Sequence, residues 1–208
     1  PDVAGTLIAG AFAIGTLILI WNVFLGAEIS PAALLTLTLA AFFPGHVYYH
    51  GVFPVSLCTF LLVLALAAYL KRRFVWAGVA AGCAAFTYSS GAFIAAVFGL
   101  HLLIVERHRP WKQQIRQWLS TSGLTVLGFA AFLAMLQLTV GTWKAYFLVQ
   151  AKYNYEPNWP WSAILEQARA MELTGPQFVH VQTVYVAILA MLLLAAAARE
   201  QVKAIDGA

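Results

Sequence analysis

The sequence predicts an all-α fold, a polytopic membrane helical bundle with about seven transmembrane or partly spanning helices and an outer amphipathic helix at the interface. Apolar residues make up 62% of the 208 residues and charged residues only 10%, whereas about a quarter of the residues in a soluble domain are charged. The apolar residues also form runs about as long as a bilayer is thick. Since every backbone group must be satisfied inside lipid, we expect these runs to be helices.

Seven apolar segments are predicted as helices within a single transmembrane domain, residues 1–208. They are Ala4–Phe24, Pro31–Phe43, Pro54–Leu70, Val75–Tyr88, Gly91–Val105, Leu119–Thr139 and Val179–Ala198. The chain opens at Pro1 without a Met, and no basic region precedes the first apolar run, so a cleavable signal peptide is not supported. We therefore expect a fragment of a longer protein.

Basic residues predict the orientation of the bundle. The breaks "KRRF" (71–74), "ERHRPWKQQIRQ" (106–117) and "REQVK" (199–203) hold nine of the twelve Lys and Arg residues. The positive-inside rule places them in the cytoplasm and the N-terminus outside. The net charge of +4 therefore reports orientation and says little about nucleic acid. The partner that the apolar composition predicts is the lipid bilayer, with no nucleic acid. The two cysteines lie within apolar runs and are interpreted as small core residues.

The outer breaks carry the polar chemistry. Two of the predicted helices near them, Val75–Tyr88 and Gly91–Val105, have about 14 or 15 residues and so span roughly 21 Å, less than the bilayer core of about 30 Å. Irregular backbone below the membrane surface is tolerated only inside protein or beside water. We therefore expect a polar cavity open to the outside, lined by His46, Tyr48, Tyr49, His50, Tyr88, Ser89 and Ser90.

A long outer segment, residues 141–178, is predicted to lie at the interface. Apolar residues recur at helical spacing from Trp161 to Ala168, with Glu166, Gln167 and Arg169 between them. This pattern indicates an amphipathic helix that begins near Pro160 and lies in the headgroup region. Such a helix would cover the mouth of the cavity.

The order of several motifs resembles the membrane-embedded glycosyltransferases of the GT-C class, especially the bacterial relatives of the glycosylphosphatidylinositol mannosyltransferases. These motifs are "FFP", an aromatic polar break, "SL" at the start of the next helix, "LKRRFVWAGVAAGCAAFTYSSG" and "GTWKAYFLVQAKYNYEPNWPW". The resemblance extends from about Gly5 to Met171. It implies an integral, multi-pass protein of the bacterial cytoplasmic membrane that transfers a mannose-like sugar from a polyprenyl-phosphate donor to an unknown acceptor on the extracytoplasmic side.

The resemblance also implies where the chain departs from the family. Its general base is an acidic residue of an early outer loop, which would lie upstream of Pro1, so no catalytic residue is assigned here. Val55 stands where the family has Glu, and Tyr88 stands where it has Arg. Arginine holds phosphate with a fork of donors, and tyrosine does not replace its charge. Either the donor is held differently or the cavity is not catalytic.

Each candidate binding residue has a structural alternative. His46 and His50 are interpreted as polar site residues or as structural hydrogen-bonding groups, and no metal site is assigned because no third ligand is evident. Tyr48 and Tyr49 are also typical interface anchors. Gln150 and Lys152 match the outer segment of the family, and Lys152 would meet either a donor phosphate or lipid headgroups. The sugar rings would stack on Tyr49, Tyr153, Trp159 or Trp161. No cofactor is expected.

His101 has a different prediction, because it lies inside an apolar run and we expect a hydrogen bond between helices there. Two other function classes stay open. A transporter would use the recessed breaks as a path, although no internal repeat is evident. A non-catalytic membrane scaffold would explain the missing Glu and Arg.

Overall fold

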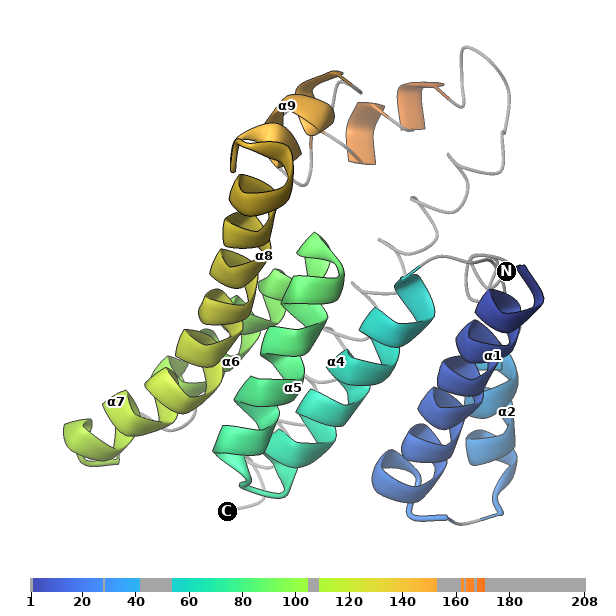
Figure 1. Ribbon diagram of the computed structural model, residues 1–208. Helices are drawn as coiled ribbons and strands as arrows, with labels where there is room; N and C mark the ends of the chain where they lie inside the picture. The colour runs from blue at the N-terminus through green and yellow to red at the C-terminus, as the bar shows by residue number, and fades with distance from the viewer. Residues whose placement is uncertain are drawn as a thin grey trace. The chain divides into compact units, whose positions relative to one another are not determined.

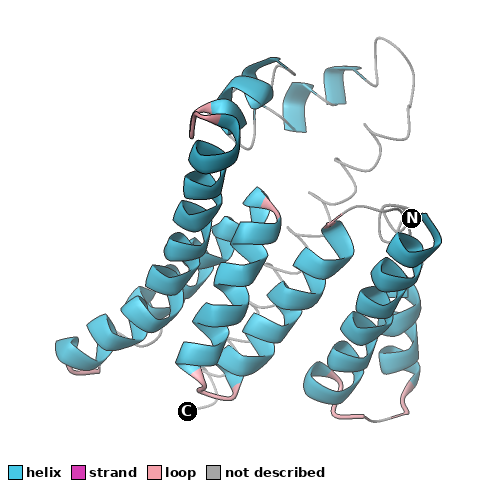
Figure 2. Ribbon diagram, in the orientation of Figure 1, coloured by secondary structure: helices cyan, strands magenta, loops and turns pink. Residues whose placement is uncertain are grey.

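The computed structural model describes residues 2–27, 29–41, 54–104, 109–152, 162, 164–166 and 168–170. These residues are helical or lie in short turns, and none of them is in a strand (Figure 2). The chain divides into two compact units, Pro1–Val149 and Gln150–Ala208. The first unit contains almost all of the described residues and is the subject of the following paragraphs.

The predicted apolar runs in the described ranges are helices, which confirms the all-α fold class. The elements are α1 (Asp2–Leu19), a π-helical turn (Ile20–Phe24), α2 (Pro31–Ala41), α4 (Val55–Leu70), α5 (Phe74–Thr87), a 3₁₀ turn (Ser89–Phe93), α6 (Ile94–Ile104), α7 (Trp111–Trp118), a second π-helical turn (Leu119–Gly123), α8 (Leu124–Val140) and α9 (Ala145–Lys152). The predicted helix at 179–198 and most of the break at 44–54 lie outside the described residues.

One predicted break is partly wrong. The basic segment 106–117 was expected to separate two helices, but Trp111–Trp118 is helical and continues into α8 through the second π-helical turn. Lys, Gln and Arg have nearly the helix propensity of leucine, so a polar stretch does not by itself end a helix. Pro110 begins this helix, as proline commonly does.

Two of the described helices are long and apolar enough to cross a membrane. They are Val3–Phe24, with 22 residues, and Trp111–Val140, with 30 residues. Four other apolar helices are shorter: Pro31–Ala41, Val55–Leu70, Phe74–Thr87 and Ser89–Ile104. The structure therefore supports two candidate spanning helices in the described ranges, whereas the sequence predicted six there that span fully or partly.

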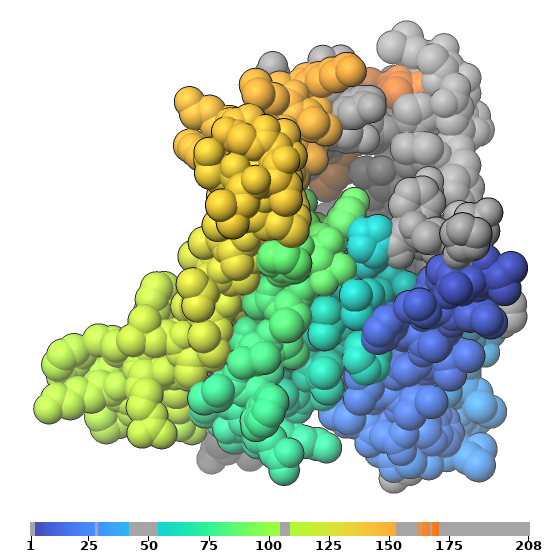
Figure 3. All heavy atoms as spheres, in the orientation of Figure 1, coloured from blue at the N-terminus to red at the C-terminus, as the bar shows by residue number. Residues whose placement is uncertain are grey.

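The first unit packs its helices in the order α1, α4, α5 and α8 (Figures 1 and 3). Its buried core is made mostly of small side chains, with Ala65, Ala77, Ala81, Ala84 and Ala85 fully buried. The larger buried side chains gather in one cluster, in which Tyr69 and Phe98 pack together. Many large apolar side chains, in contrast, are exposed on every long helix.

Glycines set the close contact of α5 with α8. A Cβ added at Gly78 would overlap the carbonyl oxygen of Ser120, and one at Gly82 would lie 2.8 Å from that of Leu124. A Cβ at Gly128 would in turn overlap the backbone of Gly82. Since real Cβ atoms do not approach other atoms this closely, the two helices meet backbone to backbone. Small residues permit the same close approach between helices in membranes.

Candidate functional site

The best-described part of the predicted site is the turn between α5 and α6. Tyr88 leaves α5 with an extended backbone, and Ser89 opens the 3₁₀ turn that leads into α6. The amide of Gly91 donates to the carbonyl of Tyr88 at 2.8 Å. A Cβ at Gly91 would lie 2.6 Å from the carbonyl carbon of Ala84, so the turn folds back tightly on α5 only because residue 91 is glycine.

Tyr146 ties this turn to the segment that follows α8. Its hydroxyl donates to Ser89 Oγ at 2.8 Å, across 57 residues of sequence. Its ring packs edge-on against Phe129, Phe132 and Phe147, with centroids 5.2–6.2 Å away. Three aromatic neighbours therefore hold the ring, while the hydroxyl reaches the turn. This is usual for tyrosine, whose ring is apolar and whose hydroxyl needs a hydrogen-bond partner.

The start of α4 lies at the same end of the unit as this turn. The thiol of Cys58 approaches the carbonyl of Ala84 at 3.8 Å, which fixes the register of α4 against α5. The two helices are joined by the short loop at residues 71–73 and run in opposite directions (Figure 1). Val55 lies three residues before Cys58, and Tyr88 lies four residues after Ala84. Both residues therefore lie at the same end of this helix pair. We call this the turn end, and the end with residues 71–73 the basic end.

The predicted binding residues that the structure describes fall into two groups. Tyr88 is 45% exposed, Ser89 is partly buried and Ser90 is exposed, all at the turn end. Gln150 and Lys152 lie in the last turn of α9, in the second unit. The remaining candidates lie outside the described residues, and they are His46, Tyr48, Tyr49, His50, Tyr153, Trp159 and Trp161. The cavity that they were expected to form together stays a prediction.

The predicted amphipathic helix is described in part. Residues 164–166 and 168–170 are helical, while Trp161 and Gln167 lie outside the described residues. Leu165 is 55% exposed. The helical character of this stretch agrees with the prediction, and its place at an interface stays a prediction.

His101 occupies the place expected of a packed histidine. Its Nδ1 shares a hydrogen bond of 2.9 Å with the hydroxyl of Tyr69, which joins α6 to α4. The Tyr69 ring stacks on Phe98 with centroids 4.5 Å apart and meets Phe74 edge-on. Tyr69 is only 7% exposed, so the prediction of a histidine hydrogen-bonded between helices is confirmed.

No metal centre is formed by the residues in the described ranges, where no three His, Cys, Asp or Glu side chains gather. Acidic residues are also scarce by sequence, since residues 54–104 and 109–152 contain no Asp or Glu. This part of the chain therefore has no carboxylate that could act as a general base. Its polar side chains are mainly hydroxyls, amides and cations, together with the imidazole of His101.

Sequence reasoning missed three tertiary features, which are two contacts and one buried side chain. They are the bond between Tyr146 and Ser89, the bond from Ser122 Oγ to the carbonyl of Ala95 at 2.8 Å, and the burial of Gln117, which is 5% exposed. No local pattern indicates them, because each joins distant elements. The contact between α5 and α8 did have a signal in "GVAAG" (78–82), where two glycines are four residues apart on one helix face.

A comparison of this chain with models of known protein families, with curated proteins and with solved structures finds no match.

Proposed function

We propose that the chain is the membrane-embedded part of a glycosyltransferase similar to the GT-C class. It transfers a mannose-like sugar from a polyprenyl-phosphate donor to an acceptor on the extracytoplasmic side of a bacterial membrane. The observation that carries this proposal is the meeting of the start of α4, the Tyr88–Gly91 turn and Tyr146 at one end of the first unit. The resemblance rests on motifs in the same three places of the sequence.

The packing of the first unit supports the membrane part of the proposal. Large apolar side chains such as Leu7, Trp76 and Leu138 are 68–87% exposed, while the buried side chains are mostly small. A soluble protein does not leave so much apolar surface in water, whereas lipid removes the reason to bury it and small residues then form the helix contacts. Trp76 and Trp111 are exposed at the basic end, and such residues are typical of the headgroup level.

The proposed mechanism is direct displacement at the anomeric carbon. The acceptor hydroxyl attacks this carbon, a base outside the described residues takes its proton, and the polyprenyl phosphate leaves with the bonding electron pair. This chain would supply hydrogen-bond donors and aromatic surfaces at the turn end. Ser89 and Tyr146 position the turn. The segment "PGHVYYHGVFP" (44–54) directly precedes α4 in the sequence, and in this proposal its His50 contacts the donor.

The test is transfer of a labelled sugar from polyprenyl phosphomannose in membranes that contain the full-length protein. His50→Ala should reduce transfer by roughly ten- to a hundredfold, because a hydrogen bond to a charged group contributes about 1.5–3 kcal/mol. The level of the variant in the membrane should not change. His101→Ala is the matched control, since it should act through stability.

A second function is favoured by one observation. Val55 and Tyr88 come to the same end of α4 and α5, and both lack the charge found at these places in the family. A non-catalytic membrane scaffold would have this property. If membranes with the wild-type protein transfer no more sugar than membranes without it, or His50→Ala transfers as well as wild type, the enzyme proposal is wrong at this site.

A further inference from the structure

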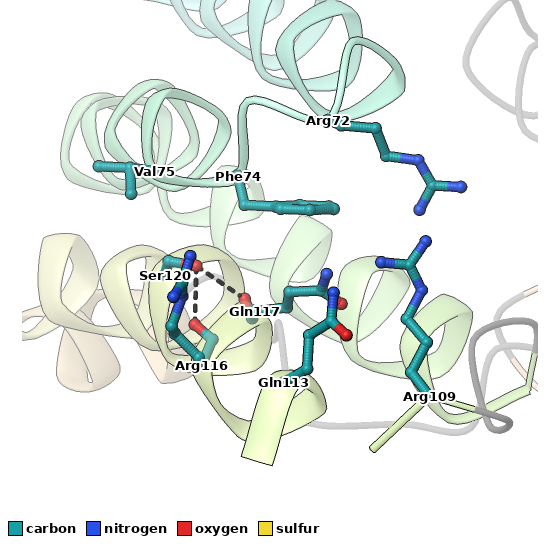
Figure 4. Close-up of a pocket in the computed structure, with 8 residues that line it drawn as sticks. All are labelled: Arg72, Phe74, Val75, Arg109, Gln113, Arg116, Gln117 and Ser120. Carbon is teal, nitrogen blue, oxygen red and sulfur yellow. Dashed lines mark hydrogen bonds between the residues drawn. The ribbon is translucent and has the colours of Figure 1, made fainter. Parts of the chain in front are cut away.

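A cavity of about 360 Å³ lies at the basic end, away from the turn end (Figure 4). It is bounded by the loop after α4, the first turn of α5, α7 with the residue Arg109 before it, and the second π-helical turn. The residues that line it are Arg72, Phe74, Val75, Arg109, Gln113, Arg116, Gln117 and Ser120. Three arginines and two glutamines therefore surround one small space.

The residues that line this cavity are basic, polar or apolar, and none of them is acidic. Glu106 lies three residues before Arg109 in the sequence, outside the described residues. No Asp or Glu occurs in residues 54–104 or 109–152. Figure 4 shows the guanidinium groups of Arg72 and Arg109 pointing toward each other. Arg72 and Arg109 each also take part in another interaction. Two guanidinium groups that face each other repel, and an anion between them would reduce this repulsion. Figure 4 draws Arg116 apart from this pair, beside Ser120.

A buried amide gives independent evidence for a ligand. Gln117 is 5% exposed, and its Oε1 has no hydrogen-bond partner among the described residues. In Figure 4 its amide lies beside that of Gln113 and faces the space below Arg72 and Phe74. A buried polar atom without a partner is costly and calls for an explanation such as a bound molecule. A donor in the cavity would satisfy this oxygen.

The loop that carries Arg72 supports a role in binding. The amide of Arg73 donates to the carbonyl of Ala68, and that of Arg72 to the carbonyl of Tyr69, both at 2.9 Å. These bonds form a Schellman motif, in which the residue in the left-handed conformation is usually glycine. Arg72 has φ +58° there. Arginine therefore occupies a backbone conformation that glycine adopts with less strain, and the Arg72 side chain lines the cavity.

We propose that this cavity binds a phosphate group that carries or adjoins a hydroxyl, as in a phosphoglycerol lipid headgroup or monoprotonated inorganic phosphate. Phosphate oxygens accept hydrogen bonds from the arginine forks, as is usual for Arg and phosphate, and the hydroxyl donates to Gln117 Oε1. Basic pockets between helices at the cytoplasmic face bind headgroups in this way. The site is separate from the proposed sugar-transfer site at the turn end.

The experiment measures binding to the purified full-length protein in a neutral detergent. One arm adds short-chain phosphatidylglycerol, with short-chain phosphatidylcholine as the comparison, and the other adds inorganic phosphate. Affinity is followed by the shift in melting temperature with ligand concentration. We expect phosphatidylglycerol to bind and phosphatidylcholine not to bind. Protection by inorganic phosphate alone would identify free phosphate as the source.

Three variants decide whether the binding uses this cavity. Arg109→Gln should weaken binding by about tenfold or more, because one of the two facing guanidinium groups is lost. Arg72→Gly should do the same while the unliganded protein still folds, because glycine suits the left-handed position. Lys112→Gln removes the same charge from α7 but does not line the cavity, so it should bind like wild type.

Two results would overturn the proposal. One is that neither phosphatidylglycerol nor inorganic phosphate raises the melting temperature of the wild-type protein. The other is that Arg109→Gln and Arg72→Gly bind like wild type, or that Lys112→Gln weakens binding as much as they do, since the attraction would then be general. None of these outcomes depends on sugar transfer, so failure here is distinguishable from failure of the proposed function.

Discussion

Tyr69 shows how a single polar group is used inside an apolar bundle. Its ring fills the core against Phe98 and Phe74, while its hydroxyl reaches His101 on α6. Several other buried hydroxyls bond within their own helix, as Thr121 does to the carbonyl of Gln117 and Thr125 to that of Thr121. The Tyr69 hydroxyl instead connects two helices, as does the Ser122 hydroxyl, which bonds to the carbonyl of Ala95.

We predict that Tyr69→Phe lowers the free energy of unfolding by about 1 kcal/mol, the usual contribution of one hydrogen bond. The ring remains and keeps its stacking, so the effect is confined to the hydroxyl. Thermal unfolding in detergent measures the change. Tyr88→Phe is the control, because Tyr88 is 45% exposed and should lose almost nothing. If Tyr69→Phe has the same melting temperature as the wild-type protein, the hydrogen bond to His101 contributes no stability.

The pairing of α5 with α8 depends on glycine at the element scale. Gly78 and Gly82 face Ser120, Leu124 and Gly128 across the contact. Leucine and alanine could fill most other positions of these helices, but a single methyl group at the contact has no room. Backbone shape, more than side-chain interdigitation, therefore determines how these two helices meet.

Gly128→Ala should destabilise the protein by about 1–3 kcal/mol, the range for overpacking a tight contact. Gly10→Ala on α1 is a matched substitution, because a Cβ there meets nothing within 4 Å. It should instead raise stability by about 0.5–1 kcal/mol, since alanine is the better helix former. Melting temperatures of the two variants test this directly. Equal effects at both sites would contradict the glycine contact.

The distribution of charge over the whole molecule predicts its orientation. The basic residues of the 71–73 loop, Arg109 and Arg116 lie at one end of the first unit, and the Tyr88–Gly91 turn lies at the other. If the unit is embedded in a bilayer as proposed, the positive-inside rule places the basic end in the cytoplasm. The two ends should therefore differ in their access to reagents added outside the cell.

A cysteine at Ser89 should react with a membrane-impermeant thiol reagent added to intact cells, whereas one at Arg72 should react only after the membrane is opened. The native thiols are replaced first (Cys58→Ala, Cys83→Ala), because Cys83 is exposed. Labelling of Arg72→Cys after lysis serves as the control that the reagent can reach this position. Labelling at position 72 from outside intact cells would reverse the orientation.

The sequence by itself determined that the described chain is helical, because long apolar runs of leucine and alanine have no other way to satisfy their backbone groups in lipid. It also predicted that His101 would be hydrogen-bonded between helices, since a lone polar ring in such a run needs a partner. It did not predict that α7 joins α8, because polar residues with good helix propensity do not mark a helix end.

Only the tertiary structure decided which residues meet. Ser89 and Tyr146 are 57 residues apart, and the cavity at the basic end combines three arginines from two separate breaks. Helical periodicity records which side chains share a face of one helix, but not which faces come together. That choice depends on close contacts between helices, here those at Gly78, Gly82 and Gly128, and these become visible only when the helices are packed.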